Sequence, residues 1–271
     1  MKRIVCFLLA LIPLLGVAQK NNYNVKGKFS NSAVAGKIYI TYYMGQKEFK
    51  DSSEVKQGKF ELKGEVEGPA SAWMAFKPMV LVKKKKGYDG LSFYLDKGTI
   101  LIDIKDSLKH ALISSSLINT AHKKYQAAIE GPDQVIEKLR REYYQLTAEQ
   151  KKDKSVTEAL GSKMDKADAL KEEAQRLYIL QNPNSYFSLQ ALQGVGGSYF
   201  NVQKVEPLFA KLSPQLRSSK EGQVFAASIA RAKTTVIGKT APDFTQNDPV
   251  GKTNENSSGS ISALAIAICL T

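Results

Sequence analysis

The hydrophobic pattern of this chain changes its period near residue 114, and this change divides the fold into two parts. Between residues 23 and 113, short segments such as YNVKGKF, GKIYITYY and GKFELKG alternate apolar with polar residues or are rich in β-branched and aromatic ones. Glycine, asparagine, aspartate and proline separate them. This spacing is typical of an antiparallel sandwich or a barrel-like sheet. The single tryptophan, Trp73, is predicted to belong to the core of this sheet and not to a ligand platform.

After residue 114, apolar residues recur at three- and four-residue steps, which predicts about five or six helices. One apolar stripe is formed by Val135, Ile136, Leu139 and Tyr143. A longer helix is expected to begin at the capping-box pattern of Ser155–Glu158 and to end at Asn182–Pro183. We therefore predict an α+β protein, with an antiparallel β-sandwich-like domain at residues 23–113 followed by a helical segment at residues 114–237.

Further polar residues mark the starts of the later helices. Asn184 or Ser185 is a predicted N-cap, Ser213–Pro214 opens another helix, and Ser218–Glu221 opens a third. The glycine-rich stretch Gly194–Ser198 is interpreted as a flexible connector between helices. It lacks the last glycine of a dinucleotide-binding fingerprint and follows a predicted helix instead of a strand.

The chain is basic, with 39 Lys and Arg residues against 26 Asp and Glu residues, a net charge of +13. Such an excess can favour a nucleic acid or an anionic membrane surface. No aromatic nucleic-acid motif, zinc-finger spacing or helix-turn-helix pattern accompanies it. We expect a lysine-rich solvated surface and no nucleic-acid partner, and we leave association with a membrane surface open.

The first residues have the pattern of a secretory signal peptide. Lys2 and Arg3 precede an apolar run from Ile4 to Leu15, and Gly16 and Ala18 occupy the positions that a signal peptidase reads. The apolar run is short for a membrane helix, although an uncleaved anchor is the alternative. We predict a signal peptide at residues 1–18 and a location in the periplasm or cell envelope.

The common active-site motifs are incomplete. Two Gly-Lys-Thr triplets begin at Gly238 and Gly251, but Lys233 and Gln246 stand where a phosphate-binding loop needs its first glycine. The Ser53–Lys56 stretch has the spacing of a serine–lysine nucleophile pair. That chemistry uses a helix, whereas a strand directs these two side chains to opposite faces.

Other reactive side chains also lack the spacing of a site. His110 and His122 do not form a metal-ligand pair, and His122 is expected to be solvated. Glu172 and Glu173 are adjacent on a predicted helix and point in different directions. The lysine run at residues 83–86 is interpreted as a hairpin tip, with an acidic partner as the alternative. The sequence therefore predicts no catalytic, cofactor-binding or metal-binding residues and no cofactor.

Three stretches resemble a known group of proteins. GKTAPDFTQND, from Gly238, resembles the opening segment of thioredoxin-like domains in the peroxiredoxin and thiol-disulfide interchange group of Bacteroidota envelope proteins. Residues 51–74 resemble an uncharacterised N-terminal β domain of the DUF4369 type, and residues 182–192 resemble part of the helical connector in the same proteins. The resemblance implies an exported protein whose N-terminal part positions the redox domain or recognises partners.

The last residues depart from that group. The resemblance implies a Trp-Cys-x-x-Cys site after the opening segment, but the only cysteine outside the predicted signal peptide is Cys269. We interpret residues 238–271 as a truncated start of a thioredoxin-like domain followed by a disordered tail, produced by a frameshift or a premature stop. A naturally short relative with its own tail is the alternative.

Three functions are compatible with the sequence. The first is a non-catalytic accessory or recognition part of a thiol-disulfide interchange protein, with envelope proteins as partners. The second is an independent envelope module that binds a protein or an acidic ligand through the sheet face around Trp73 or through the lysine run. The third is an oxidoreductase that uses Cys269 as a single thiol, although no resolving cysteine accompanies it.

Overall fold

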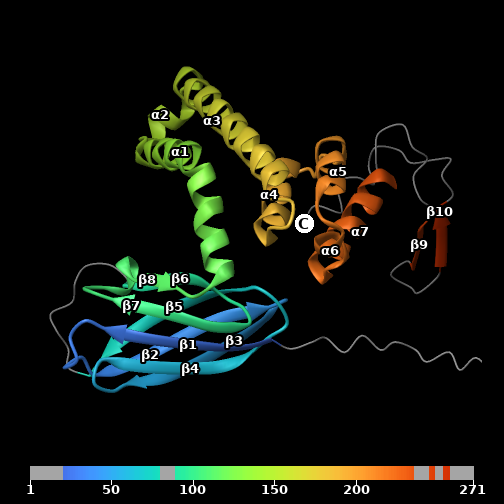
Figure 1. Cartoon of the computed structure of the whole chain (residues 1–271). Helices are drawn as coiled ribbons and strands as arrows, with labels where there is room; N and C mark the ends of the chain where they lie inside the picture. The colour runs from blue at the N-terminus through green and yellow to red at the C-terminus, as the bar shows by residue number, and fades with distance from the viewer. Residues whose placement is uncertain (1–20, 80–88, 235–243, 248–252, 257–271) are drawn as a thin grey trace, which may run out of the picture. The chain divides into compact units, whose positions relative to one another are not determined.

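The computed structural model describes residues 21–79, 89–234, 244–247 and 253–256. The chain divides into two compact units between Thr120 and Ala121. The first consists of two sheets of mostly antiparallel strands, and the second is largely helical (Figure 1). The predicted α+β class and the order of its two parts are confirmed.

Eight strands of the first unit form two four-stranded sheets that lie face to face (Figure 1). One sheet has the order β4-β1-β7-β8 and the other β3-β2-β5-β6. All neighbouring strands are antiparallel except β1 and β7, which are parallel. The strands are β1 (Asn21–Phe29), β2 (Gly36–Met44), β3 (Lys47–Val55), β4 (Lys59–Val66), β5 (Ala70–Pro78), β6 (Gly90–Leu95), β7 (Gly98–Ile104) and β8 (Leu112–Ser114).

The core of this unit follows from strict alternation along the strands. Successive side chains of a strand point to opposite faces of the sheet, so every second residue is buried. In β2 the buried residues are Ile38, Ile40 and Tyr42, and in β7 they are Ile100, Ile102 and Ile104. Phe93 from β6 and Met74 from β5 add to the same core. Burial of apolar area at about 25 cal/mol per Å² is the main stabilising contribution of such a core.

Two glycines inside strands make room for aromatic rings of the core. Gly27 on β1 lies opposite Phe60 on β4, and a Cβ atom on Gly27 would overlap the Phe60 ring. Gly64 on β4 lies opposite Tyr23 on β1, and a Cβ there would overlap the Tyr23 ring. The two pairs are reciprocal, because each strand supplies one ring and one glycine. Aromatic rings that cover strand glycines in this way help to fix the register of two strands.

The first turn of the long helix α1 (Leu117–Gln145) is attached to the edge of the β3-β2-β5-β6 sheet through Asn119. The Asn119 Nδ2 donates to the carbonyl of Tyr94 on β6 at 2.7 Å, and its Oδ1 accepts from the Tyr94 N–H at 2.8 Å. Nδ2 also donates to Ser116 Oγ at 2.7 Å. Asn119 is buried, so these bonds satisfy polar groups that would otherwise be costly.

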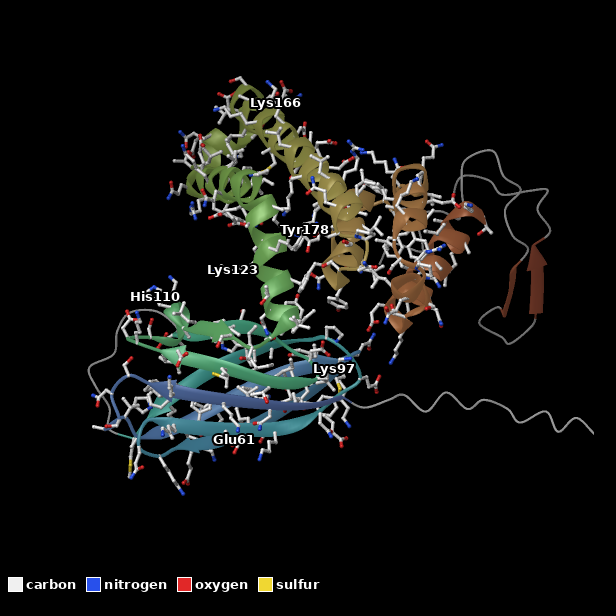
Figure 2. The ribbon with its side chains drawn as sticks, viewed as in Figure 1. Glu61, Lys97, His110, Lys123, Lys166 and Tyr178 are labelled. Carbon is white, nitrogen blue, oxygen red and sulfur yellow. The ribbon has the colours of Figure 1, made fainter. Side chains whose placement is uncertain are left out.

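The helical unit continues from α1 through six further described helices. They are α2 (Ala148–Lys152), α3 (Lys154–Gln181), α4 (Tyr186–Gly196), α5 (Val202–Lys211), α6 (Pro214–Ser218) and α7 (Lys220–Thr234). Tyr178 of α3 lies beside α1, where its ring packs edge-on against Tyr125 with centroids 5.0 Å apart (Figure 2). Phe187 of α4 is fully buried next to both helices and stacks on Tyr125.

Several helix boundaries agree with the sequence prediction and others do not. Ser185 and Ser213 cap α4 and α6, and α3 ends at Asn182, as predicted. The start of α3 differs, because the carboxylate of Asp153 and not Ser155 accepts from the first free N–H groups. The capping box of this region is formed instead by Thr147 and Gln150 at the start of α2.

Two predicted features of the helical region were wrong. Ile136 and Leu139 are buried against α3, but Val135 and Tyr143 of the expected apolar stripe are largely exposed. Gly194 and Gly196 belong to the last turn of α4 and not to a flexible connector. The helix stops at Gly197, whose φ of +64° suits glycine.

Beyond the helices, β9 (Phe244–Asn247) and β10 (Thr253–Asn256) pair as antiparallel strands, in a stretch for which the sequence predicted no fold of its own. The predicted signal peptide, the lysine run at 83–86, the triplet at 238–240 and Cys269 lie outside the described residues. Within the described residues, no helix has both the length and the apolar composition needed to cross a bilayer.

Candidate functional site

Trp73 lies on the outer side of the β3-β2-β5-β6 sheet, so its predicted core position was wrong. Its neighbours Ala72 and Met74 are buried, and the alternation of the strand therefore directs Trp73 to solvent. The side chain is 44% exposed. The segment SAWMAFK is apolar on both sides of the strand, which is why its pattern alone does not show which side faces the core.

Two more aromatic side chains share this side of the sheet with Trp73. Tyr39 and Tyr43 of the neighbouring strand β2 are 40% and 55% exposed. Thr41, which lies between them along β2, is directly opposite Trp73. On the other side of Trp73, β6 places Ser92 opposite it. We call this surface the aromatic face; its outward residues are Tyr39, Thr41, Tyr43, Ser71, Trp73, Ala75, Gly90, Ser92 and Tyr94.

The Trp73 ring leans across the neighbouring strand and covers Gly90. A Cβ atom on Gly90 would overlap three atoms of the indole ring. A ring so close to the position of a Cβ lies over the strand backbone instead of standing upright on the sheet. Gly90 thus makes room for an aromatic ring on the outer surface as Gly27 does in the core, and the Trp73 side chain remains partly exposed.

The aromatic face carries no charge, and charged groups surround it. Lys37 and Lys77 lie opposite each other at one end of β2 and β5. Along the side of the face, strand β3 places Lys50 opposite Thr41 and Glu48 opposite Tyr43. Glu48 pairs with Lys50 at 2.6 Å and accepts from Tyr43 Oη at 3.0 Å. These hydrogen bonds, from Lys50 first and Tyr43 second, lower the pKa of the Glu48 carboxyl, so it stays ionised and paired at neutral pH.

The outer side of the β4-β1-β7-β8 sheet carries many charged side chains, unlike the aromatic face. A hollow of about 550 Å³ there is lined by charged side chains and by apolar residues that include Phe60, Leu101 and Ile102. Lys28 pairs with Asp103 at 3.0 Å, and Lys63 pairs with Glu61 at 3.2 Å. Glu61 lies on the outside of the sandwich, on the sheet that contains β4 (Figure 2). These mutual pairs are typical of a solvated sheet face.

Comparison with protein families supplies an independent assignment of this region. The family model described as "Domain of unknown function (DUF4369)" matches residues 23–123. The chain carries a DUF4369 domain. The matched range contains every residue of the aromatic face and also Asn119, and it covers less than half of the chain. No curated protein and no solved structure matches the chain significantly.

Among the described residues of the DUF4369 domain, the reactive side chains are not brought together into a site. Ser53 lies within β3, and Lys56 follows that strand, so the serine–lysine spacing falls in extended chain. His110 Nδ1 lies 3.2 Å from both Asp106 Oδ2 and Ser107 Oγ in an exposed 3₁₀ turn, η1 (Leu108–His110). Among the described residues, no group of three or more His, Cys, Asp or Glu side chains is placed to hold a metal ion.

The adjacent glutamates of α3 point to different partners, as expected. Glu172 binds Lys204 of α5 through both carboxylate oxygens, at 2.7 and 2.8 Å. Glu173 binds Arg176 on its own helix at 2.7 and 2.8 Å. The two carboxylates therefore act as separate surface ion pairs and do not form an acid–base pair.

His122, expected to be solvated, is half-buried in the helical unit. Its ring stacks on that of Phe187, with centroids 5.0 Å apart. Burial disfavours the charged imidazolium and lowers the pKa of His122 below its usual 6.5. The residue thus contributes to the packing of α1 on α4 in its neutral form.

We expect the stability of the helical unit to decrease as the pH falls through and below about 6.5. His122 takes up a proton more readily when the chain is unfolded, because its pKa in the folded state is lowered. Its contribution is therefore complete above the unfolded pKa and is lost as the pH falls towards the folded pKa. Urea unfolding followed by far-ultraviolet circular dichroism at several pH values measures this. A His122→Gln variant should show a flatter dependence, and an unchanged slope would contradict the role of His122.

Proposed function

We propose that this chain is an exported binding protein whose DUF4369 domain recognises a ligand through the aromatic face. The observation that carries the proposal is the set of three exposed aromatic rings, Tyr39, Tyr43 and Trp73, on one uncharged sheet surface. Exposed apolar patches of this kind on soluble proteins usually mark interaction sites. A net charge of +13 makes an uncharged surface on this chain more notable.

The physical properties of the face suit binding. Aromatic side chains offer a large contact area with few rotatable bonds, so little conformational entropy is lost when a ligand covers them. The rings stand on strands in the middle of the sheet, β2 and β5, which are held on both sides by neighbouring strands. A rigid support of this kind lowers the free-energy cost of association.

We further propose that the chain acts as a non-catalytic recognition part in thiol-disulfide interchange in the cell envelope. The signal-like first residues support export, and the opening motif from Gly238 together with the DUF4369 match supports the connection with thiol-disulfide proteins. A mature N-terminus at Gln19, read by mass spectrometry of protein isolated from the envelope, would test export. Turnover in an insulin-reduction assay by the purified chain would contradict the non-catalytic role.

The binding function can be tested directly because Trp73 is the single tryptophan of the chain. Its fluorescence reports on the aromatic face alone. We expect at least one envelope fraction, tested as separate protein, polysaccharide and lipid-vesicle fractions, to shift the Trp73 emission and to protect it from acrylamide quenching. The effect should weaken in a Tyr39→Ala, Tyr43→Ala double variant and persist in Leu101→Ala on the opposite sheet. If no fraction changes the emission, the proposed function is wrong.

A further inference from the structure

The orientation of Trp73 limits which ligand surface can contact it. The ring lies over Gly90 and the side chain is 44% exposed, an arrangement that suits contact through a face of the indole more than through its edge. The face of an aromatic ring carries partial negative charge, and it attracts weakly positive C–H or N–H groups. A ligand that fits must therefore offer a flat surface of C–H groups. The face of a pyranose sugar has this property.

The charge of the aromatic face limits the ligand further. The nine outward positions of the face hold no Lys, Arg, Asp or Glu residue. An anionic polymer needs closely spaced cationic side chains, and a cationic one needs free carboxylates. The nearest carboxylate past Tyr43, that of Glu48, is already bound by Lys50 and by Tyr43. Lys37 and Lys77 lie side by side at one end of the face, where the Lys37 Nζ is 5.6 Å from the centroid of the Tyr39 ring. The centre of the face around Trp73 is therefore the part that is complementary to an uncharged ligand.

The polar groups of the face also match sugar hydroxyls. Thr41, Ser71 and Ser92 surround Trp73 on three neighbouring strands, and each hydroxyl can both donate and accept a hydrogen bond. Sugar hydroxyls have the same double capacity. A proline-rich peptide offers mainly carbonyl acceptors and fits between upright rings, whereas this indole lies across its sheet.

The rings extend over more than one sugar unit. Tyr39 and Tyr43 are four residues apart on β2, which corresponds to about 13 Å along a strand. Trp73 lies opposite the midpoint of this distance on the adjacent strand, roughly 5 Å to the side. The three rings thus form a shallow row that a chain of sugars can follow, whereas one monosaccharide would contact only one of them.

We infer that the aromatic face binds an uncharged oligosaccharide chain, with the sugar rings stacked on Trp73 and on the two tyrosines. This inference rests on the proposed function and names the ligand class of the same surface. Tyr39 and Tyr43 act as further stacking positions, and Gly90 is a positioning residue because it allows the indole to lie flat.

The test uses the full chain and defined probes. Cellohexaose and maltohexaose represent neutral sugar chains, a heparin hexasaccharide is the anionic probe, and decaproline is the peptide probe. We expect one of the neutral hexasaccharides to change the Trp73 emission saturably at millimolar concentration. Calorimetry should show about tenfold weaker binding in the Tyr39→Ala, Tyr43→Ala variant, because two of the three stacking rings are lost.

Two controls separate a local effect from misfolding. Leu101→Ala, on the charged outer side of the other sheet, should bind like the unmodified chain, and far-ultraviolet circular dichroism should be unchanged in every variant used. A further variant tests the role of Gly90 itself. Gly90→Val places a branched side chain where the indole lies, so it should weaken binding severalfold although Tyr39 and Tyr43 are intact.

The outcomes distinguish this inference from the function on which it rests. If decaproline, heparin or an envelope protein fraction protects Trp73 and neither neutral hexasaccharide does, the carbohydrate inference is wrong and the binding function stands. A hexasaccharide that binds equally well to the double tyrosine variant would also overturn the inference, because it would bind elsewhere. If nothing protects Trp73, both proposals fail.

Discussion

Replacement of Phe187 by alanine is expected to destabilise the helical unit by about 3–5 kcal/mol. The side chain is fully buried at the start of α4. It stacks on His122 and Tyr125, with centroids at 5.0 and 5.9 Å, and meets Tyr186 edge-on at 5.5 Å. Truncation removes these contacts and leaves a cavity between α1 and α4 that the surrounding rings cannot fill without leaving their own positions.

Two optical signals measure this effect separately in the two units. Far-ultraviolet circular dichroism follows mainly the helices, whereas fluorescence of Trp73 follows the β-sandwich. The urea midpoint seen by dichroism should fall strongly in Phe187→Ala, and the fluorescence midpoint should stay near that of the unmodified chain. Tyr199→Ala is the control, because Tyr199 is fully exposed and its loss should cost less than about 0.5 kcal/mol. A dichroism midpoint unchanged by Phe187→Ala would refute the packing role.

Alanine at position 27 is expected to destabilise the β-sandwich by about 1–3 kcal/mol. The added methyl group would overlap the ring of Phe60, which is only 5% exposed. This ring packs against Phe29 within the buried core, so a shift of the ring would disturb its core neighbours. Backbone strain does not cause the effect, since the φ of Gly27 is not positive and alanine can adopt it.

Gly90→Ala is the matched control for this prediction. Its methyl group would overlap the indole of Trp73 as closely as the one at position 27 overlaps Phe60. Trp73 is on the surface, however, so its ring can turn away into solvent. We expect a change in stability below about 1 kcal/mol, together with a red-shifted emission and easier acrylamide quenching. Equal losses of stability in the two variants, measured by urea unfolding, would show that burial of the ring is not the deciding factor.

Much of the fold could be predicted because local chemistry decides it. Alternation in segments such as GKFELKG fixes which side chains are buried once two sheets face each other. Ser185 and Ser213 cap helices because a short hydroxyl side chain satisfies N–H groups of the first turn, whatever lies further away. Asn182–Pro183 ends a helix for an equally local reason.

The remaining features depend on partners that are distant in the sequence. The position of α3 decides which side of α1 is buried. For this reason Ile136 is buried and Val135 is exposed. Gly194 is helical because its bare Cα leaves room for the side chain of Gln175, which also binds Tyr125 Oη at 2.9 Å. Neither relation is visible in a window of sequence.

The sequence offered the sheet face around Trp73 only as an alternative binding surface, and the tyrosines of this face were missed for a similar reason. Trp73 was expected in the core because tryptophan is usually buried, and the apolar residues around it gave no contrary signal. The exposed positions of Tyr39 and Tyr43 on β2 were the available signal, since they alternate with Ile38, Ile40 and Tyr42. Strand register then brings both tyrosines beside Trp73, and register is not readable from one strand alone.

The two hydrogen bonds between Asn119 and Tyr94 determine where the chain can be shortened to give a stable fragment of the β-rich part. A fragment that stops at residue 113, as the change of sequence period suggests, would lose the amide that binds the N–H and the carbonyl of Tyr94 on edge strand β6. Unpaired backbone groups of an edge strand can bind strands of neighbouring molecules, so such a fragment should precipitate or form fibrils. Extending it through the first turns of α1 would keep the edge closed and the fragment soluble.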